Sequence, residues 1–290
     1  MPPRFDTITF LSDYGTGDEF VGVVHSVIRS IAPHVTVIDL THEIPPYDVR
    51  AGSLTLGRAA QYLCPGVVLA VVDPGVGTER RAVAIEVGGG QSYLVGPDNG
   101  LLASAVAMSG GVTAVVELTN RERQLAAPGA TFAGRDIFAP AAAHLCNGVP
   151  LEELGTTIDP MSLRPGLMPL PRDDAGALVA EVLWVDRFGN CQLNVDPAEI
   201  DDLGARVQLR WGEDVRTAER AATYEGIAVG QVGLVTDSYG LLSVCMGKRS
   251  AADELAMRVG TEVTRAAPGD GDLPADGISR PVTLTPRSTS

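Results

Sequence analysis

Residues 69–87 read LAVVDPGVGTERRAVAIEV, in which two apolar, strand-like runs flank a polar turn. Proline and glycine are enough to make such a turn, because they supply the backbone angles that it needs. The turn also carries an acid and a base, Asp73 and Arg80, seven residues apart. Two explanations remain open: a structural ion pair, worth about 0–1 kcal/mol if exposed, or a carboxylate that the arginine keeps ionised so that it can orient or deprotonate a water molecule.

The apolar run before Asp73 belongs to a longer alternation of strand-like and helix-like segments. Residues 66–72 (GVVLAVV) are continuously apolar, which is typical of a strand buried on both faces near the centre of a sheet. Further strands are expected at 7–12, 36–40, 82–87, 92–96 and 114–118, and helices at 19–31, 49–62 and 138–146. This alternation predicts an α/β domain with a largely parallel sheet over residues 1–156.

The pattern changes after residue 156. Residues 157–177 are rich in proline and show little periodicity, which predicts a linker. Residues 178–265 contain short strand-like segments separated by glycine and aspartate turns, which predict a small all-β domain folded as an antiparallel barrel. Residues 266–290 have few large apolar side chains and are predicted to form a flexible tail.

Composition narrows the classes of partner. The formal net charge of −14 argues against nucleic acid and anionic membrane surfaces, which require basic patches, and suits a neutral or cationic small molecule. No apolar run approaches the about 20 residues of a membrane span, and the N-terminal residues lack the layout of a signal peptide. The four cysteines and four histidines are scattered without metal-ligand spacing. We therefore expect a cytoplasmic protein with neither a metal nor a bound cofactor.

Polar residues stand where apolar strands give way to glycine-containing turns, namely Asp13, Asp73 and the pair Asp98–Asn99. In open α/β sheets, ligands bind outside the carboxyl ends of the strands, so these side chains are candidates to line one pocket. The simpler explanation of any one of them is that aspartate favours turns by bonding to nearby backbone. The GxGxxG and P-loop spacings that cradle phosphates are absent. A nucleoside remains open, and Asp13 is a candidate to hold its ribose diol.

Two other glycine-containing stretches offer binding groups. GATFAGRDIFAP places Gly134 before a helix, where backbone without a Cβ lets a ligand approach closely, although the glycine also simply relieves strain at a helix entry. WVDRFGNCQLNV places Asp186, Phe188 and Asn190 around a tight turn. An aromatic ring and an amide suit a flat base; the alternative is that Phe188 belongs to the core and Asn190 to the turn.

Taken together, these motifs resemble those of the S-adenosylmethionine hydroxide adenosyltransferases, relatives of the fluorinase and chlorinase enzymes. The matching stretches are FLSDYGTGDEF, DLTHEIPPYDV, VVDPGVGTERR, GPDNGLL, TFAGRDIFAP, DRFGN and DSYGLLSV. They occur in this order within residues 8–247, so the resemblance covers most of the chain.

The resemblance implies an α/β domain joined to a β barrel, assembled as a homotrimer with the nucleoside between one subunit's N-terminal domain and its neighbour's barrel. It implies that Asp73 and Arg80 handle the water. The implied substrate-binding residues are Asp13 and Tyr47 for the ribose and base, Phe188 and Asn190 for the adenine, and Asp186 and Ser238 for the methionine end. Asn99 and Gly134, which lie in two of the matching stretches, are expected to bind substrate as well.

Asp73 indicates whether the nucleophile is water or a halide ion. The halogenases have an uncharged residue at this position, and a buried carboxylate repels a halide ion but accepts water. The chain departs from the resemblance at Ala133, where hydroxide-transferring members usually have histidine, and at MGKR (246–249), where an asparagine-containing stretch is usual. The predicted function is hydrolysis of S-adenosylmethionine to adenosine and L-methionine. The alternatives are a halide-dependent adenosyltransferase and a non-catalytic protein that binds S-adenosylmethionine or adenosine.

Overall fold

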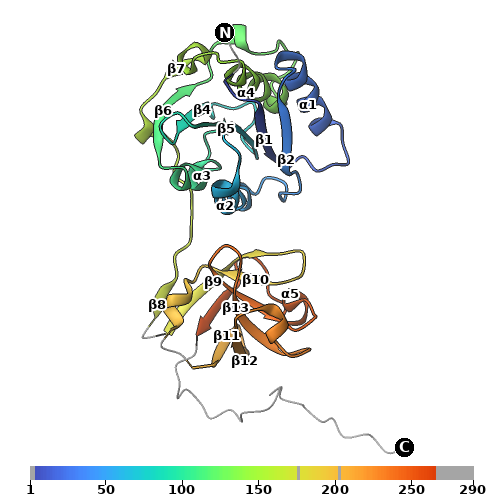
Figure 1. Cartoon of the computed structure of the whole chain (residues 1–290), viewed down its shortest axis with the longest axis vertical. Helices are drawn as coiled ribbons and strands as arrows, with labels where there is room; N and C mark the ends of the chain where they lie inside the picture. Colours follow the sequence, from blue (N-terminus) through green and yellow to red (C-terminus); the bar gives the residue numbers. More distant parts are fainter. Residues whose placement is uncertain (1–3, 175–176, 202–203, 266–290) are drawn as a thin grey trace, which may run out of the picture. The chain divides into compact units, whose positions relative to one another are not determined.

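The computed structural model describes residues 4–174, 177–201 and 204–265, which form two compact units, one up to Met168 and one from Pro169 on (Figure 1). This division falls inside residues 157–177, the stretch that the sequence predicts to be a linker. The predicted tail, residues 266–290, lies outside the described residues. The two units have separate hydrophobic cores.

The N-terminal unit is built on one sheet with the strand order β2-β1-β3-β5-β4-β6-β7. The strands are β1 (Thr7–Ser12), β2 (Thr36–Thr41), β3 (Val67–Val71), β4 (Ala82–Val87), β5 (Ser92–Pro97), β6 (Val112–Glu117) and β7 (Thr156–Thr157). Strands β2, β1, β3 and β5 run parallel, whereas β4, β6 and β7 are each antiparallel to the strand before them in the sheet. Every residue of β3 is buried, as expected for a central strand. The predicted α/β class with a mostly parallel sheet is confirmed.

Helices pack on both faces of this sheet. They are α1 (Phe20–Ile31), α2 (Val49–Ala59), α3 (Ala103–Met108) and α4 (Ala139–Cys146). Helices α1 and α4 contribute to one core cluster, and α2 and α3 to another. Alternate side chains of β3 enter the two clusters, Leu69 the first and Val68 and Ala70 the second, because successive residues of a strand point to opposite faces. The sheet is therefore the middle of three layers, and the carboxyl ends of its parallel strands share one edge.

The C-terminal unit is a closed barrel. Its strands follow the order β10-β14-β13-β12-β11-β15-β9, and β9 pairs with β10 to complete the ring. They are β9 (Ala177–Val185), β10 (Cys191–Leu193), β11 (Arg206–Trp211), β12 (Asp214–Ala221), β13 (Val232–Thr236), β14 (Leu242–Met246) and β15 (Glu262–Arg265). Strand β8 (Arg172–Asp174) pairs with the first residues of β9, and α5 (Ala251–Glu254) precedes β15. All pairs are antiparallel except β12 and β13, which run parallel. The predicted barrel is confirmed.

The longest helix in the described part of the chain, α1, has 12 residues. No helix there has the length and apolar composition that a membrane crossing requires.

Candidate active site

The turn after β3 brings Asp73 and Arg80 together. Arg80 Nε donates a hydrogen bond of 3.0 Å to Asp73 Oδ1, and Arg80 Nη2 donates to Oδ2, so the contact is bidentate. The two side chains are only 5% and 11% exposed, and the guanidinium carbon lies 5.4 Å from the centre of the Phe138 ring. The pair is therefore buried, and the explanation as a weak exposed ion pair does not apply.

The environment of Asp73 acts on its pKa in opposing directions. Burial raises the pKa, Arg80 lowers it by charge and hydrogen bonding, and the net result is a pKa above the ordinary value of aspartate. Each carboxylate oxygen has two lone pairs, and the arginine uses only one on each. Asp73 thus retains acceptor capacity toward the pocket that it lines.

A pocket of about 300 Å³ lies at the carboxyl ends of β1 and β3. Its lining includes four of the predicted site residues: Asp13, Tyr47, Asp73 and Gly134. Asp13 follows β1, and its Oδ2 accepts a hydrogen bond of 2.9 Å from the Tyr47 backbone N–H. The structure thus brings together, at one edge of the sheet, residues that are as much as 121 positions apart (13 to 134) in the chain. The pocket combines two carboxylates with aromatic walls.

Tyr47 has an unusual backbone. Its φ of 69° lies in the left-handed region, which residues with a Cβ seldom occupy. Its side chain is also 74% exposed, although it is large and aromatic. Strained residues concentrate at functional sites, where the surrounding structure holds them in place. This geometry, together with its place in the pocket lining, identifies Tyr47 as a candidate ligand contact.

Gly134 lies directly against Tyr14, a residue that the sequence analysis did not select. A Cβ at position 134 would lie 2.2 Å from the Tyr14 hydroxyl, so any other residue there would displace the Tyr14 ring. Burial and the charges of Asp13, Asp73 and Asp136 together raise the pKa of Tyr14 well above its usual range. Tyr14 therefore presents a neutral hydroxyl to a pocket rich in carboxylates. Its position directly after Asp13, in SDYGTG, was the available signal.

Ala133 is part of the same pocket wall and is 7% exposed. The segment that follows it, Gly134–Phe138, forms a π-helical turn that leads into α4. Single π-helical turns within helices occur frequently at functional sites. Among the residues that line this pocket, none is a histidine.

Asn99 and its neighbour Asp98 are engaged elsewhere. Asn99 Nδ2 donates to the Val72 carbonyl at 2.9 Å, and Asn99 is not among the residues that line the pocket. Asp98 Oδ2 accepts from Arg81 Nε at 2.9 Å, and its side chain is 4% exposed. Through these hydrogen bonds, both residues hold the carboxyl end of β5 against Val72 and Arg81. A substrate-binding role for Asn99 stays a prediction.

The barrel has a second, larger pocket of about 920 Å³, and its lining includes the other four predicted binding residues: Asp186, Phe188, Asn190 and Ser238. Asp186 organises this loop. Its Oδ1 accepts 2.8 Å hydrogen bonds from the backbone N–H groups of Phe188 and Asn190, and its Oδ2 accepts one of 2.8 Å from Asn190 Nδ2. The Phe188 ring is 78% exposed, so it does not belong to the core.

Asp237 organises the loop that carries Ser238, as Asp186 organises the loop of Phe188 and Asn190. Its Oδ1 accepts a hydrogen bond of 2.8 Å from the Tyr239 backbone N–H, and its Oδ2 accepts one of 2.5 Å from Gln192 Nε2. Gln192 is 2% exposed and also lines the pocket. Neither Asp237 nor Gln192 was predicted as a site residue. The stretches DSYGLLSV and WVDRFGNCQLNV, in which they lie, were the available signals.

Outside both pockets, one further group has the spacing of metal ligands in the described part of the chain. It consists of His25, Asp39 and His42, with donor atoms within 4.8 Å of one another.

These features define a two-domain protein, an α/β unit with a carboxylate-lined pocket followed by a closed β barrel with a pocket of its own. The chain belongs to the SAM hydroxide adenosyltransferase family: the family model of the N-terminal domain matches residues 8–155, and that of the C-terminal domain matches residues 180–264.

Curated relatives support this assignment. The chain is 45% identical to an (R)-S-adenosyl-L-methionine hydrolase of Salinispora tropica, over 87% of this chain and 95% of the relative. It is 41% identical to a protein of the same name from Thermus thermophilus, over 88% and 98%. A fluorinase of an Actinoplanes species is more distant, at 28% identity over 89% and 96%. Among solved structures, an uncharacterized conserved protein from Thermotoga maritima matches with a TM-score of 0.82 and 36% identity, over 90% of this chain and 100% of that one.

The buried ion pair generates a prediction about stability. Arg80→Gln should destabilise the N-terminal unit by about 3–5 kcal/mol at neutral pH, because it leaves a buried carboxylate without its cation. The double variant Asp73→Asn/Arg80→Gln should lose less, because neither side chain then carries a charge. Urea unfolding followed by far-ultraviolet circular dichroism measures this, since helices α1 to α4 lie in this unit.

The barrel provides an internal control for this experiment. Both tryptophans, Trp184 and Trp211, lie in the C-terminal unit, so their fluorescence follows barrel unfolding separately. A double variant that loses as much stability as the sum of the two single variants would contradict the coupling between Asp73 and Arg80.

Proposed function

We propose that this protein hydrolyses S-adenosylmethionine, with water attacking C5′ of the ribose to give adenosine and L-methionine. The observation that carries the proposal is the buried Asp73–Arg80 pair, whose carboxylate lines the same pocket as Asp13. Support also comes from relatives in Salinispora and Thermus that match at 41–45% identity and are named (R)-S-adenosyl-L-methionine hydrolases.

The chemistry explains why a single carboxylate–arginine pair suffices. The C5′–O bond forms as the C5′–S bond breaks, and the electrons of the broken bond go to sulfur. L-Methionine leaves as a neutral thioether and needs no general acid. Asp73 orients the attacking water and accepts the proton that this water loses, on one of its free lone pairs. The other requirements are in-line placement and a pocket with little water. As proposed, the reaction uses no metal and no cofactor.

The N-terminal pocket is proposed to hold the ribose and the sulfonium. Asp13 accepts hydrogen bonds from the ribose diol, and Tyr47 packs against the ribose or base. Gly134 allows close approach at the wall formed with Tyr14. The carboxylates of Asp13 and Asp73 also favour binding of the positively charged substrate over binding of a neutral ligand.

The barrel pocket is proposed to hold the adenine and the methionine end. The exposed Phe188 ring offers a stacking surface, and the Asn190 amide offers hydrogen bonds to the edge of the base. Ser238 and Asp186 receive the amino-acid moiety. Asp186 has an additional task, because its hydrogen bonds hold the loop that presents Phe188 and Asn190.

The proposal includes a homotrimer in which the N-terminal pocket of one subunit and the barrel pocket of its neighbour form one active site. It is supported by the exposure of two large aromatic residues, Tyr47 at 74% and Phe188 at 78%, each in one of the two pockets. Aromatic side chains of this kind are enriched at interfaces. A cytoplasmic location is also proposed, since all four cysteines are unpaired and thiols persist in a reducing compartment.

A halide-dependent reaction is favoured by one observation, the small side chain of Ala133 in the pocket wall, and opposed by the carboxylate of Asp73. Chromatography of the products formed with and without chloride distinguishes the two reactions. Adenosine under both conditions indicates hydrolysis, and a chloride-dependent nucleoside indicates halogenation. Bound substrate without any product indicates a binding protein.

Asp73→Asn should lower turnover of S-adenosylmethionine about 10²- to 10⁴-fold, because the amide cannot take up a proton. Ligand binding, measured by isothermal titration calorimetry, should change little. The matched control is Asp98→Asn, which alters an equally buried aspartate, paired with Arg81 outside the pocket. This control should retain turnover per folded molecule, and an Asp73→Asn enzyme with unchanged turnover would contradict the role of Asp73.

The rate should also depend on pH through Asp73. Because its pKa lies above the ordinary 3.8, kcat/KM should fall as the pH is lowered through that raised value. The folded state binds this proton more tightly than the unfolded state, so the contribution of Asp73 to stability is lost as the pH rises from 3.8 through the raised pKa. Asp73→Asn should remove both dependences. An acid limb that persists unchanged in the residual activity of this variant would assign it to another group.

The shared active site predicts complementation between defective subunits. Asp73→Asn impairs the N-terminal pocket, and Phe188→Ala impairs the barrel pocket. Co-expressed subunits carrying different tags, purified through both tags, should regain activity above the sum of the two homomeric variants. Light scattering after gel filtration should give a trimer. A mixed assembly with no gain would indicate that each subunit forms its own site.

A further inference from the structure

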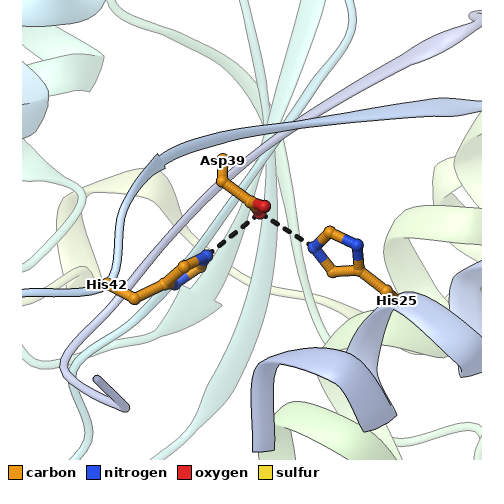
Figure 2. Close-up of side chains that lie close together, drawn as sticks. All are labelled: His25, Asp39 and His42. Carbon is orange, nitrogen blue, oxygen red and sulfur yellow. Dashed lines mark hydrogen bonds and ion pairs between the residues drawn. The ribbon is translucent and has the colours of Figure 1, made fainter. Parts of the chain in front are cut away.

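Three side chains of the N-terminal unit converge outside the pocket that contains Asp73. His25 comes from α1, Asp39 from β2, and His42 from the segment directly after β2. Figure 2 shows the two imidazole rings on either side of the carboxylate, each with a nitrogen directed toward it. The His25 Nε2 to Asp39 Oδ1 distance is 2.8 Å, and the His42 Nε2 to Asp39 Oδ1 distance is 3.0 Å.

The geometry of His42 is unusual. The residue is 5% exposed, its ring packs 4.6 Å from that of Phe10, and its Nδ1 lies 2.8 Å from Ser12 Oγ. Its Nε2 is buried and lies 3.0 Å from Asp39 Oδ1 without forming a well-aligned hydrogen bond. The ligand atoms of His25, Asp39 and His42 all lie within 4.8 Å of one another, which is close enough for them to contact one ion.

We propose that His25 Nε2, the Asp39 carboxylate and His42 Nε2 bind one divalent first-row transition-metal ion, of which Zn²⁺ has the best match. Zinc binds imidazole nitrogen and carboxylate oxygen at about 2.0–2.2 Å, so tetrahedral ligands lie about 3.3–3.5 Å apart. The separations of 2.8 and 3.0 Å from Asp39 need to open by a few tenths of an ångström, and the two histidine nitrogens, which lie within 4.8 Å of each other, need to reach the same spacing.

The surroundings of the three ligands suit such an ion. Nδ1 of the buried His42 ring carries the proton when Nε2 binds metal, and Ser12 Oγ is in place to accept a hydrogen bond from this N–H. A metal-bound histidine is usually oriented by a hydrogen bond that its other ring N–H donates. The side chains of His25 and Asp39 are 33% and 41% exposed, which leaves a path for the ion and a position for water. Arg29, one turn after His25, directs its guanidinium to the Pro33 carbonyl.

The proposed site is separate from the reaction. None of its three ligands lines the pocket around Asp73. Ser12, however, is the last residue of β1 and directly precedes Asp13. A bound ion therefore fixes His42 against the end of the strand that carries Asp13, and it stabilises the N-terminal unit by mass action.

The test is metal binding to the full chain, without substrate. The protein is freed of any polyhistidine tag, carries Cys64→Ser because the exposed Cys64 thiol can also bind metal, and is dialysed against a chelator. Calorimetric titration with Zn²⁺ should show one ion per chain. His25→Ala should weaken this binding at least about tenfold, and so should the isosteric Asp39→Asn. The control is His34→Ala, which removes an exposed imidazole that forms a hydrogen bond with the Phe5 carbonyl, and it should bind as the parent does.

Substitution with Co²⁺ adds a spectroscopic readout of the ligands. The parent and His34→Ala should develop the visible absorption of tetrahedral cobalt, and His25→Ala should not. His25 is the residue of choice, because its side chain is 33% exposed, whereas His42 is buried against Phe10 and Ser12. Equal Zn²⁺ affinity in the parent and His25→Ala, or the absence of saturable binding at one ion per chain, would overturn the proposal.

Discussion

A charge removed from water must be compensated, and this constraint organises the N-terminal unit. Strand β3 is buried along its whole length and delivers Asp73 into the interior, where an isolated carboxylate would be very costly. The turn returns Arg80 to the same place and satisfies both oxygens. The next residue, Arg81, pairs with Asp98 at the end of β5, where its Nε and Nη2 both donate to Oδ2. Two consecutive arginines thus compensate two acids on neighbouring parallel strands.

The two pairs nevertheless have different surroundings. Asp98 is also bonded to the backbone N–H of Arg164 at 2.8 Å, and Arg81 to Ser162, so that pair is enclosed by its own chain. Asp73 lines a pocket, where its remaining lone pairs can meet a ligand. An aspartate–arginine pair therefore closes one strand end, and another leaves its strand end open for chemistry. Burial within the fold raises the pKa of Asp73, and Arg80, which the turn returns to it, limits that rise.

The fold is predictable from the sequence where a local pattern decides which element forms. The continuous apolar run of 66–72 places β3 at the centre of the sheet, and the short strands after residue 177 place the barrel. Periodicity alone did not give the antiparallel insertion of β4 between β5 and β6, or the parallel pairing of β12 with β13, because strand direction depends on contacts distant in the chain. The same limit applies to sites: His25 and Asp39 are 14 residues apart, and only the packing of α1 beside β2 joins them.

Strand β2 also has a consequence for how these molecules behave at high concentration. It lies at one edge of the sheet, and an edge strand offers unpaired backbone groups to a second chain. The charge of Asp39, in the middle of this strand and beside the exposed Ile38, makes such strand addition unfavourable. The opposite edge is β7, which has only two residues and so offers too short a template. Charge on one edge strand and the short length of the other thus both disfavour the addition of a second chain.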